Sequence, residues 1–223
     1  VKATPADAWV VCSAPREVLK WFADQETPAF AHFGRRRGLP IAGVGPDHVE
    51  AGCKVARRLI ELGHQRIVIL VRESQRAGGV GASERAFFEV MAAHGLPSGP
   101  YNLPDWEDSP DGFYGVLDEL FRVTPPTALM IDEPFLFHAA KDHLAQRGIL
   151  APKHVSLICS DPDPTFAWSR PSIAHIRWDH RPVVRRVVRW TNNVAQGKKD
   201  IRQSFTKAEY VDGETVGKVP DGT

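Results

Sequence analysis

Cysteine is scarce in this sequence, in which Cys12, Cys53 and Cys159 are the three that occur among 223 residues. They lie far apart, and no two of them have the C-x-x-C spacing of a zinc site or a redox motif. Secreted domains that depend on disulfides carry many more cysteines for their size. The scarcity therefore argues against a disulfide framework and a metal site, and we expect a cytoplasmic protein.

An excess of charge of one sign is also lacking. Lysine and arginine number 28 and aspartate and glutamate 27, which gives a formal net charge of +1. A surface that binds DNA through phosphate contacts carries a clear positive excess. The basic runs Arg35–Arg37 and Arg185–Arg186 are interpreted as solvated surface. If the protein acts on DNA, residues outside this sequence must bind it.

Long apolar runs are missing as well. No stretch approaches the roughly 20 apolar residues that cross a bilayer, and residues 1–7 lack the basic start and apolar run of a signal peptide. We therefore expect no membrane partner and find no sign of export. Hydrophobic residues make up 43% and charged residues 25% of the sequence, values typical of a folded globular protein.

Motifs of catalysis and cofactor binding are absent from the sequence. It has no G-x-S-x-G nucleophile elbow, no G-x-x-x-x-G-K-[ST] loop, no H-E-x-x-H pair and no G-x-G-x-x-G fingerprint. The acidic pairs Asp132-Glu133 and Asp161-Pro-Asp163 leave paired-carboxylate chemistry as an alternative. We expect that the protein is not an enzyme and uses no cofactor.

Short apolar runs rich in β-branched residues recur along the chain and predict buried parallel strands. These runs are Ala8–Cys12, Pro28–Phe33, Arg66–Val71, Thr127–Ile131 and Ser156–Ser160. Helical patterns separate or follow them: Pro15–Asp24, Val49–Leu62, Glu84–His94, Gly112–Arg122, Phe135–Arg147 and Pro182–Gln196. This alternation predicts an α/β fold with a doubly wound parallel sheet, whose ligands bind beyond the carboxyl ends of the strands.

Five blocks of sequence carry a family signal. The most specific is Val44–Gly52 followed by Arg58–Ile67, a stretch that runs from an aspartate through a helix to Leu-Gly-His. The later blocks are Phe87–Pro97, Pro126–Ala128, His154–Asp161 and Pro171–Ile176. In order and spacing, these blocks resemble the effector-binding part of the lac and purine repressor family of bacterial transcriptional regulators. The resemblance covers nearly the whole chain.

The resemblance implies two Rossmann-like lobes, periplasmic-binding-protein-like, with a ligand cleft between them. The N-terminal lobe would comprise residues 1–72 and 178–198, and the C-terminal lobe residues 73–177 and 199–223. In the family, the strand that resembles Ala8–Cys12 is the third of its lobe. We therefore expect roughly a hundred residues of upstream sequence, since a βαβ unit alone takes about 30.

The function implied by the resemblance is that of a sensor. A small polar effector, a sugar or similar metabolite, would bind to a homodimer and modulate operator DNA binding by a helix-turn-helix domain absent from this chain. Two alternatives remain open: an exported solute-binding protein of a transporter, which shares the two-lobe fold, and a sugar-processing enzyme. An upstream signal peptide would indicate the first, and turnover of the bound ligand would indicate the second.

Two aspartates are the first candidates for ligand binding. Asp47 matches a family position that holds a polar effector, but its spacing to Glu50 equally predicts a capping box with Asp47 as helix N-cap. Asp161 follows an apolar strand and matches the aspartate of the family's Gly-Phe-Asp block. A carboxylate there would face the usual ligand crevice. The alternative for Asp161 is a turn residue before Pro162.

Three further candidates come from the same resemblance. Trp106 corresponds to an aromatic residue that lies against the effector's apolar face, and its alternative is a tryptophan that closes a surface loop. His180 matches a position that is often aromatic, although a solvent-facing histidine near a helix start is also expected there. Ser13, just after the first strand, is a weaker candidate.

The sequence departs from the family pattern at two places. Ser83 stands where the family usually has an arginine that grips the effector, unless Arg85 substitutes from an adjacent position. Asp132-Glu133 stands where the family usually has an Asn-Asp pair. An acidic pair can still face hydroxyl groups, so both residues remain candidates. The usual ligand of the family cannot be assumed for this chain.

Overall fold

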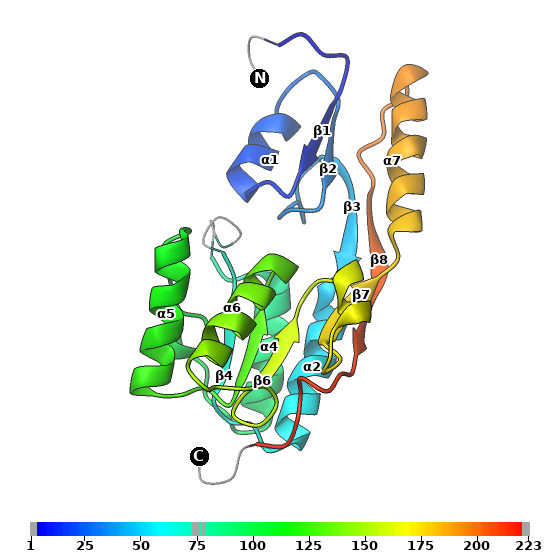
Figure 1. Cartoon of the computed structure of the whole chain (residues 1–223). Helices are drawn as coiled ribbons and strands as arrows, with labels where there is room; N and C mark the ends of the chain where they lie inside the picture. The colour runs from blue at the N-terminus through cyan, green and yellow to red at the C-terminus, as the bar shows by residue number, and fades with distance from the viewer. Residues whose placement is uncertain (1–3, 73–75, 77–78, 220–223) are drawn as a thin grey trace. The chain divides into compact units, whose positions relative to one another are not determined.

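Strands and helices alternate along the chain, as predicted from the sequence (Figure 1). The computed structural model of the protein describes residues 4–72, 76 and 79–219. Contacts group the chain into two units. Unit 1 comprises residues 1–47, 74–79 and 178–207, and unit 2 comprises residues 48–73, 80–177 and 208–223. The α/β fold class is therefore confirmed.

The predicted lobe boundaries and the observed units differ in residues 48–72 and 199–207. Residues 48–72 group with unit 2 because their helix packs against a later helix of that unit and their strand pairs with the strand Ala128–Ile131. Residues 199–207 group with unit 1 because Gln203–Lys207 pair with a strand there. Residues 73–75, 77–78 and 220–223 of the predicted lobes lie outside the described residues. The lobe boundaries stay a prediction.

Unit 1 contains a parallel sheet in the order β1-β2-β3-β8. The strands are β1 (Trp9–Cys12), β2 (Ala29–His32), β3 (Ala42–Asp47) and the first part of β8 (Gln203–Val211). Successive side chains point to opposite faces of the sheet and contribute to two apolar clusters, one on each face. Both faces of these parallel strands therefore carry a core.

Two helices cover the faces of the unit 1 sheet. In α1 (Arg16–Ala23), Leu19 and Phe22 pack with Ala31 and Ile41. On the other face, α7 (His180–Ala195) places Trp190 against Phe30, with ring centres 5.2 Å apart. The buried positions of α7 are Val183, Arg186 and Trp190. Their spacing is that of one helical face.

Arg36 occupies space that β3 leaves open. A Cβ at Gly43 would lie 2.4 Å from Arg36 Cδ, so the strand can pass beneath this side chain only where it has glycine. The guanidinium donates to the Ser204 carbonyl oxygen at 3.0 Å and lies 4.7 Å from the Phe205 ring centre. Burial, and then the charge of Arg37, lowers the pKa of Arg36 to about 10. The prediction that Arg35–Arg37 is solvated surface is therefore wrong for Arg36, which is 4% exposed.

Arg186 is a second buried arginine in unit 1. Its guanidinium donates to both carboxylate oxygens of Asp200, at 2.9 and 3.0 Å, and both side chains are 6% exposed. A third hydrogen bond from Arg186 goes to the Arg202 carbonyl oxygen at 2.6 Å. The prediction that Arg185–Arg186 is solvated surface is wrong for Arg186, because its position on α7 faces the core.

Unit 2 contains a parallel sheet in the order β4-β5-β6-β7. The strands are β4 (Ile67–Leu70), β5 (Ala128–Ile131), β6 (Ser156–Cys159) and β7 (Ala174–Trp178). Every residue of β4, β5 and β6 is buried. Continuous apolar runs of this kind are typical of parallel strands covered on both faces.

Helices cover the unit 2 sheet on both sides. They are α2 (His48–Glu61), α4 (Ala82–Ala93), α5 (Pro110–Val123) and α6 (Pro134–Gln146). Helices α2 and α4 pack against each other. The largest core cluster joins α5 and α6 to the strands and includes Phe113, Leu117, Phe137 and Leu144. Two short 3-10 helices, Pro100–Asn102 and Pro164–Trp168, complete the unit.

The predicted strands and helices are all present, with ends that shift by at most two residues. The sequence reading did not assign β3, β7 or β8 as strands. In the part of the chain that the structure describes, no helix combines the length and apolar character needed to cross a membrane. No group of three or more His, Cys, Asp or Glu side chains arranged to hold a metal ion occurs among those residues either.

Candidate functional site

Polar side chains follow three neighbouring strands of unit 2. Arg72 comes after β4, Asp132 and Glu133 after β5, and Ser160 and Asp161 after β6. Because the strands are parallel, their carboxyl ends share one edge of the sheet, which is the edge where ligands bind in open α/β folds. We call these five residues the strand-end cluster.

Asp132 is the most perturbed member of the strand-end cluster. Ser160 Oγ donates a hydrogen bond of 2.8 Å to Asp132 Oδ1, and the Asp132 backbone N–H donates to the Leu70 carbonyl oxygen. Burial, and then the nearby charge of Asp161, raises the pKa of Asp132 to about 7. A carboxyl group with that pKa exchanges its proton near neutral pH, and such groups concentrate at functional sites.

Arg72 is held by two carboxylates. Its Nε lies 2.9 Å from Asp108 Oδ1 and 3.1 Å from Oδ2, and its Nη1 lies 3.5 Å from Glu133 Oε2. The hydrogen bond that Arg72 donates to Asp108 raises the pKa of Arg72. The Arg72 guanidinium also lies 5.9 Å from the ring centre of Phe135. The arginine is therefore a fixed positive group beside the strand ends.

Glu133 has an unusual backbone conformation. Its φ is 61°, in the left-handed region that non-glycine residues seldom adopt, and it immediately precedes the first residue of α6. Strained backbone of this kind is found where a side chain must be aimed at a particular place. Here the turn directs the Glu133 carboxylate toward Arg72.

Asp161 lies near a histidine from a different element. His48 is the first residue of α2, and its Nε2 lies 3.8 Å from Asp161 Oδ1. The Asp161 side chain is 33% exposed, so a ligand can reach its carboxylate. The structure thus brings together three of the predicted residues, Asp132, Glu133 and Asp161, with His48, Arg72 and Ser160, which were not predicted.

Unit 1 has its own strand-end residues. Ser13 follows β1 with a φ of 46°, and its backbone N–H donates to the His32 carbonyl oxygen at 2.8 Å. Asp47 is the last residue of β3, and Arg37 Nη2 lies 3.2 Å from its Oδ1. Asp47 also directly precedes α2, the position of an N-cap. Both predicted residues therefore lie at carboxyl ends of strands.

Aromatic rings gather at one place in unit 1. The ring of His180 lies 4.2 Å from that of Trp178, and the Trp178 ring lies 5.2 Å from that of Phe33. His180 begins α7 and is exposed, which agrees with the interpretation of a solvent-facing histidine near a helix start. Partly exposed aromatic rings of this kind can lie against the apolar face of a sugar or a base.

Trp106 is located inside unit 2. Its side chain is 7% exposed, its Nε1 donates to the Val71 carbonyl oxygen at 3.0 Å, and its ring lies 5.1 Å from that of Phe113. These contacts favour the alternative in which Trp106 closes a loop onto the core. Contact between Trp106 and an effector stays a prediction.

Ser83 and Arg85, the residues at the first departure from the family pattern, both make hydrogen bonds within unit 2. Ser83 Oγ donates to the His48 carbonyl oxygen at 3.2 Å and so connects α4 with α2. Arg85 Nη1 donates to the Val80 carbonyl oxygen, and its side chain is exposed. The arginine of the strand-end cluster is Arg72, which pairs with Glu133. Ligand contacts by Ser83 and Arg85 remain predictions.

Sequence reasoning missed Arg72, Asp108, His48 and Trp178. Arg72 and Trp178 occupy the same relative position as Asp161, at or just after the end of a strand. That position was a signal for both residues. His48 directly follows Asp47, but its proximity to Asp161 depends on how α2 packs and has no signal in the sequence.

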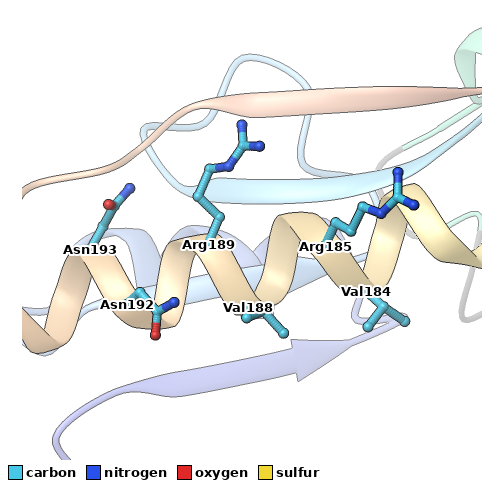
Figure 2. A pocket seen from close by; sticks show the side chains of 6 residues that line it. All are labelled: Val184, Arg185, Val188, Arg189, Asn192 and Asn193. Atoms are coloured by element: carbon cyan, nitrogen blue, oxygen red, sulfur yellow. The ribbon is translucent and has the colours of Figure 1, made fainter.

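A separate groove lies on the surface of unit 1 along α7 (Figure 2). Figure 2 shows Val184, Val188 and Asn192 projecting from one side of the helix, as their spacing of four residues requires. Arg185, Arg189 and Asn193 complete the lining. Both valines are more than half exposed. Its lining includes two arginines and no acidic or histidine side chain.

Comparisons with known proteins agree on one family. The sequence profile of the periplasmic binding protein-like domain matches residues 56–216. No curated protein sequence matches the chain. A LacI family transcriptional regulator from Enterococcus faecium with bound ribose has a similar structure, with a TM-score of 0.78 and 16% identity over 95% of this chain and 80% of that one.

Two further solved structures are similar. A LacI family regulator from Burkholderia phymatum has a TM-score of 0.77 and 25% identity over 95% of this chain and 78% of that one. A lac repressor dimer bound to operator and an anti-inducer has a TM-score of 0.73 and 15% identity over 94% and 72%. The chain therefore belongs to the periplasmic binding protein-like domain family, with the fold of the LacI-type transcriptional regulators.

Proposed function

We propose that this chain is the effector-sensing domain of a LacI-type transcriptional regulator and binds a small polar metabolite, sugar-like in its hydroxyl content. The observation that carries the proposal is the strand-end cluster, in which Asp132, Ser160 and Asp161 gather at the ligand-binding edge of a parallel sheet. Carboxylate and hydroxyl oxygens are the groups that bind sugar hydroxyls in proteins.

The similar structures support this ligand class. One of them is described with bound ribose, and it shares the fold over 95% of this chain. The aromatic rings of Phe33 and Trp178, both in unit 1, form an apolar surface with ring centres 5.2 Å apart. Exposed aromatic surface is one of the features found in sites for small polar ligands.

We infer that regulation runs through DNA binding by an attached domain. The chain itself has a formal net charge of +1, too little for a phosphate-binding surface. The lac repressor structure that it resembles is a dimer bound to operator. On this proposal the protein is a cytoplasmic homodimer, and the effector shifts the equilibrium between two arrangements because it binds one more tightly.

A thermal-shift screen against sugars, sugar phosphates, nucleobases and polyols tests the proposal. A ligand at about a hundred times its Kd should stabilise the folded chain by about 2.7 kcal/mol. Mass spectrometry of the recovered ligand then separates a sensor from an enzyme. Unchanged ligand is expected, whereas steady formation of a product would contradict the proposal.

A further inference from the structure

We propose that the effector carries a protonated amine or an equivalent cationic group, and that Asp132 is the residue that recognises it. This inference rests on the proposed function, because it names the ligand class of the same site. It begins from the second departure from the family pattern, the acidic pair Asp132-Glu133.

The Asp132 carboxylate is oriented but not neutralised. Ser160 fixes Oδ1 with a hydrogen bond of 2.8 Å, and no described residue donates a hydrogen bond to Oδ2. Among residues 4–72, 76 and 79–219, no lysine, arginine or histidine forms an ion pair with Asp132. One carboxylate oxygen is therefore available to a donor that the protein does not supply.

The surrounding charges are mostly negative. Asp161 and Glu133 both act on Asp132 by like-charge repulsion, whereas the Ser160 hydrogen bond and the charge of His48 act in the opposite direction. Arg72, the fixed cation of the cluster, is engaged by Asp108 and Glu133. Asp132 itself has no cationic side-chain partner among the described residues, and a ligand with a positive charge would supply one.

The protonation state of Asp132 should report whether the bound ligand is a cation. Burial, then the charge of Asp161, raise the pKa of Asp132 to about 7, with a smaller contribution from Glu133, while the Ser160 hydrogen bond and the charge of His48 lower it. A cation placed at Oδ2 would lower that pKa and displace the proton. A neutral sugar hydroxyl would not, because it binds a neutral carboxyl group almost as well.

The test compares ligands that differ in one amine. Glucose is paired with glucosamine, galactose with galactosamine, and glycerol with 3-amino-1,2-propanediol; N-acetylglucosamine controls for added bulk without charge. Calorimetry on the whole chain at pH 7.5 should show that the amine of at least one pair binds roughly 10- to 100-fold more tightly, the range of a charged hydrogen bond. Asp132→Asn should abolish most of that preference.

A matched variant and a second readout complete the experiment. Asp142→Asn removes a carboxylate on the exposed side of α6 and should leave the preference unchanged. At pH 7, binding of 3-amino-1,2-propanediol in buffers of different ionisation enthalpy should release about half a proton, and Asp132→Asn should release none. Circular dichroism confirms that the variants fold.

The possible results distinguish failure of the cationic-ligand inference from failure of the proposed sensor function. Equal or tighter binding of every neutral member, or a preference that persists in Asp132→Asn, overturns the cationic ligand and leaves the sensor intact. Failure of all seven compounds to bind, while the broader screen yields a neutral ligand, also overturns it. Failure of every compound in both screens contradicts the proposed function itself.

Discussion

Ser160 Oγ donates a hydrogen bond of 2.8 Å to Asp132 Oδ1 across two neighbouring strands of unit 2. The contact holds a carboxyl group at the strand ends even though burial raises its pKa to about 7. Burial of a carboxyl group costs stability, and the Ser160 hydrogen bond offsets part of that cost. This pair therefore connects the fold of unit 2 with its proposed ligand chemistry.

Asp132 should make the stability of the chain depend on pH. Its folded-state pKa is raised, so its contribution is most favourable in acid and is lost as the pH rises through about 7. Asp132→Asn should therefore gain stability relative to the parent, on the order of 2 kcal/mol at pH 8 and little at pH 4. Urea unfolding of both proteins across this range measures the difference, and parallel curves would contradict it.

The second prediction concerns the contribution of the buried Arg186–Asp200 ion pair to stability. Arg186→Ala leaves Asp200 without its bidentate partner inside the unit, and removal of one member of a buried pair typically costs about 3–5 kcal/mol. Arg185→Ala alters the adjacent, exposed position of α7 and should change stability by less than about 0.5 kcal/mol. Chemical denaturation compares the two variants. Similar losses in both would mean that the ion pair is not what stabilises α7.

Gly43 offers a test of how Arg36 is accommodated. An alanine Cβ there would approach Arg36 Cδ to 2.4 Å and the Ala31 carbonyl oxygen to 2.7 Å, so Gly43→Ala should cost about 1–3 kcal/mol by overpacking. At Gly115, on the exposed side of α5, a Cβ meets nothing within 4 Å. Gly115→Ala should instead stabilise the chain by roughly 0.5–1 kcal/mol. Thermal unfolding that ranks the two variants in the opposite order would refute this account of β3.

A variant of Trp106 tests whether this residue stabilises the core or contacts the ligand. Trp106→Phe removes the indole donor and leaves the Val71 carbonyl oxygen unpaired, which should cost about 1–3 kcal/mol of stability. Because the side chain is almost fully buried, effector affinity should change less than threefold once folding is accounted for. Calorimetry and urea unfolding on the same variant measure both quantities. Lost affinity with unchanged stability would restore the stacking role predicted from the family.

Much of the fold could be predicted because apolar runs and helix ends are local signals. Ser156–Cys159 is a run of this kind, and it forms β6 where expected. Strand β3 was missed because Gly43, Gly45 and Pro46 are poor strand residues. Glycine at positions 43 and 45 leaves room for the Arg36 side chain, a contact that no strand pattern encodes.

The site was predictable only where a residue ends a recognisable strand. Asp132 and Asp161 met that condition, and the structure places both in the strand-end cluster. The contact between Arg72 and Asp108 joins a strand end to a loop 36 residues away, which no local pattern encodes. The two buried arginines were misread for a related reason, since a basic run gives no indication of which member faces the core.

The central claim is that Asp161 and its neighbours bind a small polar effector, and one titration tests it most directly. Isothermal calorimetry with the tightest ligand of the screen is run on the parent chain, Asp161→Asn and Asp163→Asn. Asp163 lies two residues on and caps a short 3-10 helix through Thr165, a role that asparagine can also fill. The account predicts that Asp161→Asn weakens binding by about 1.5–3 kcal/mol while Asp163→Asn binds as the parent does. Unchanged affinity in a folded Asp161→Asn variant would remove Asp161 from the binding site and contradict the account.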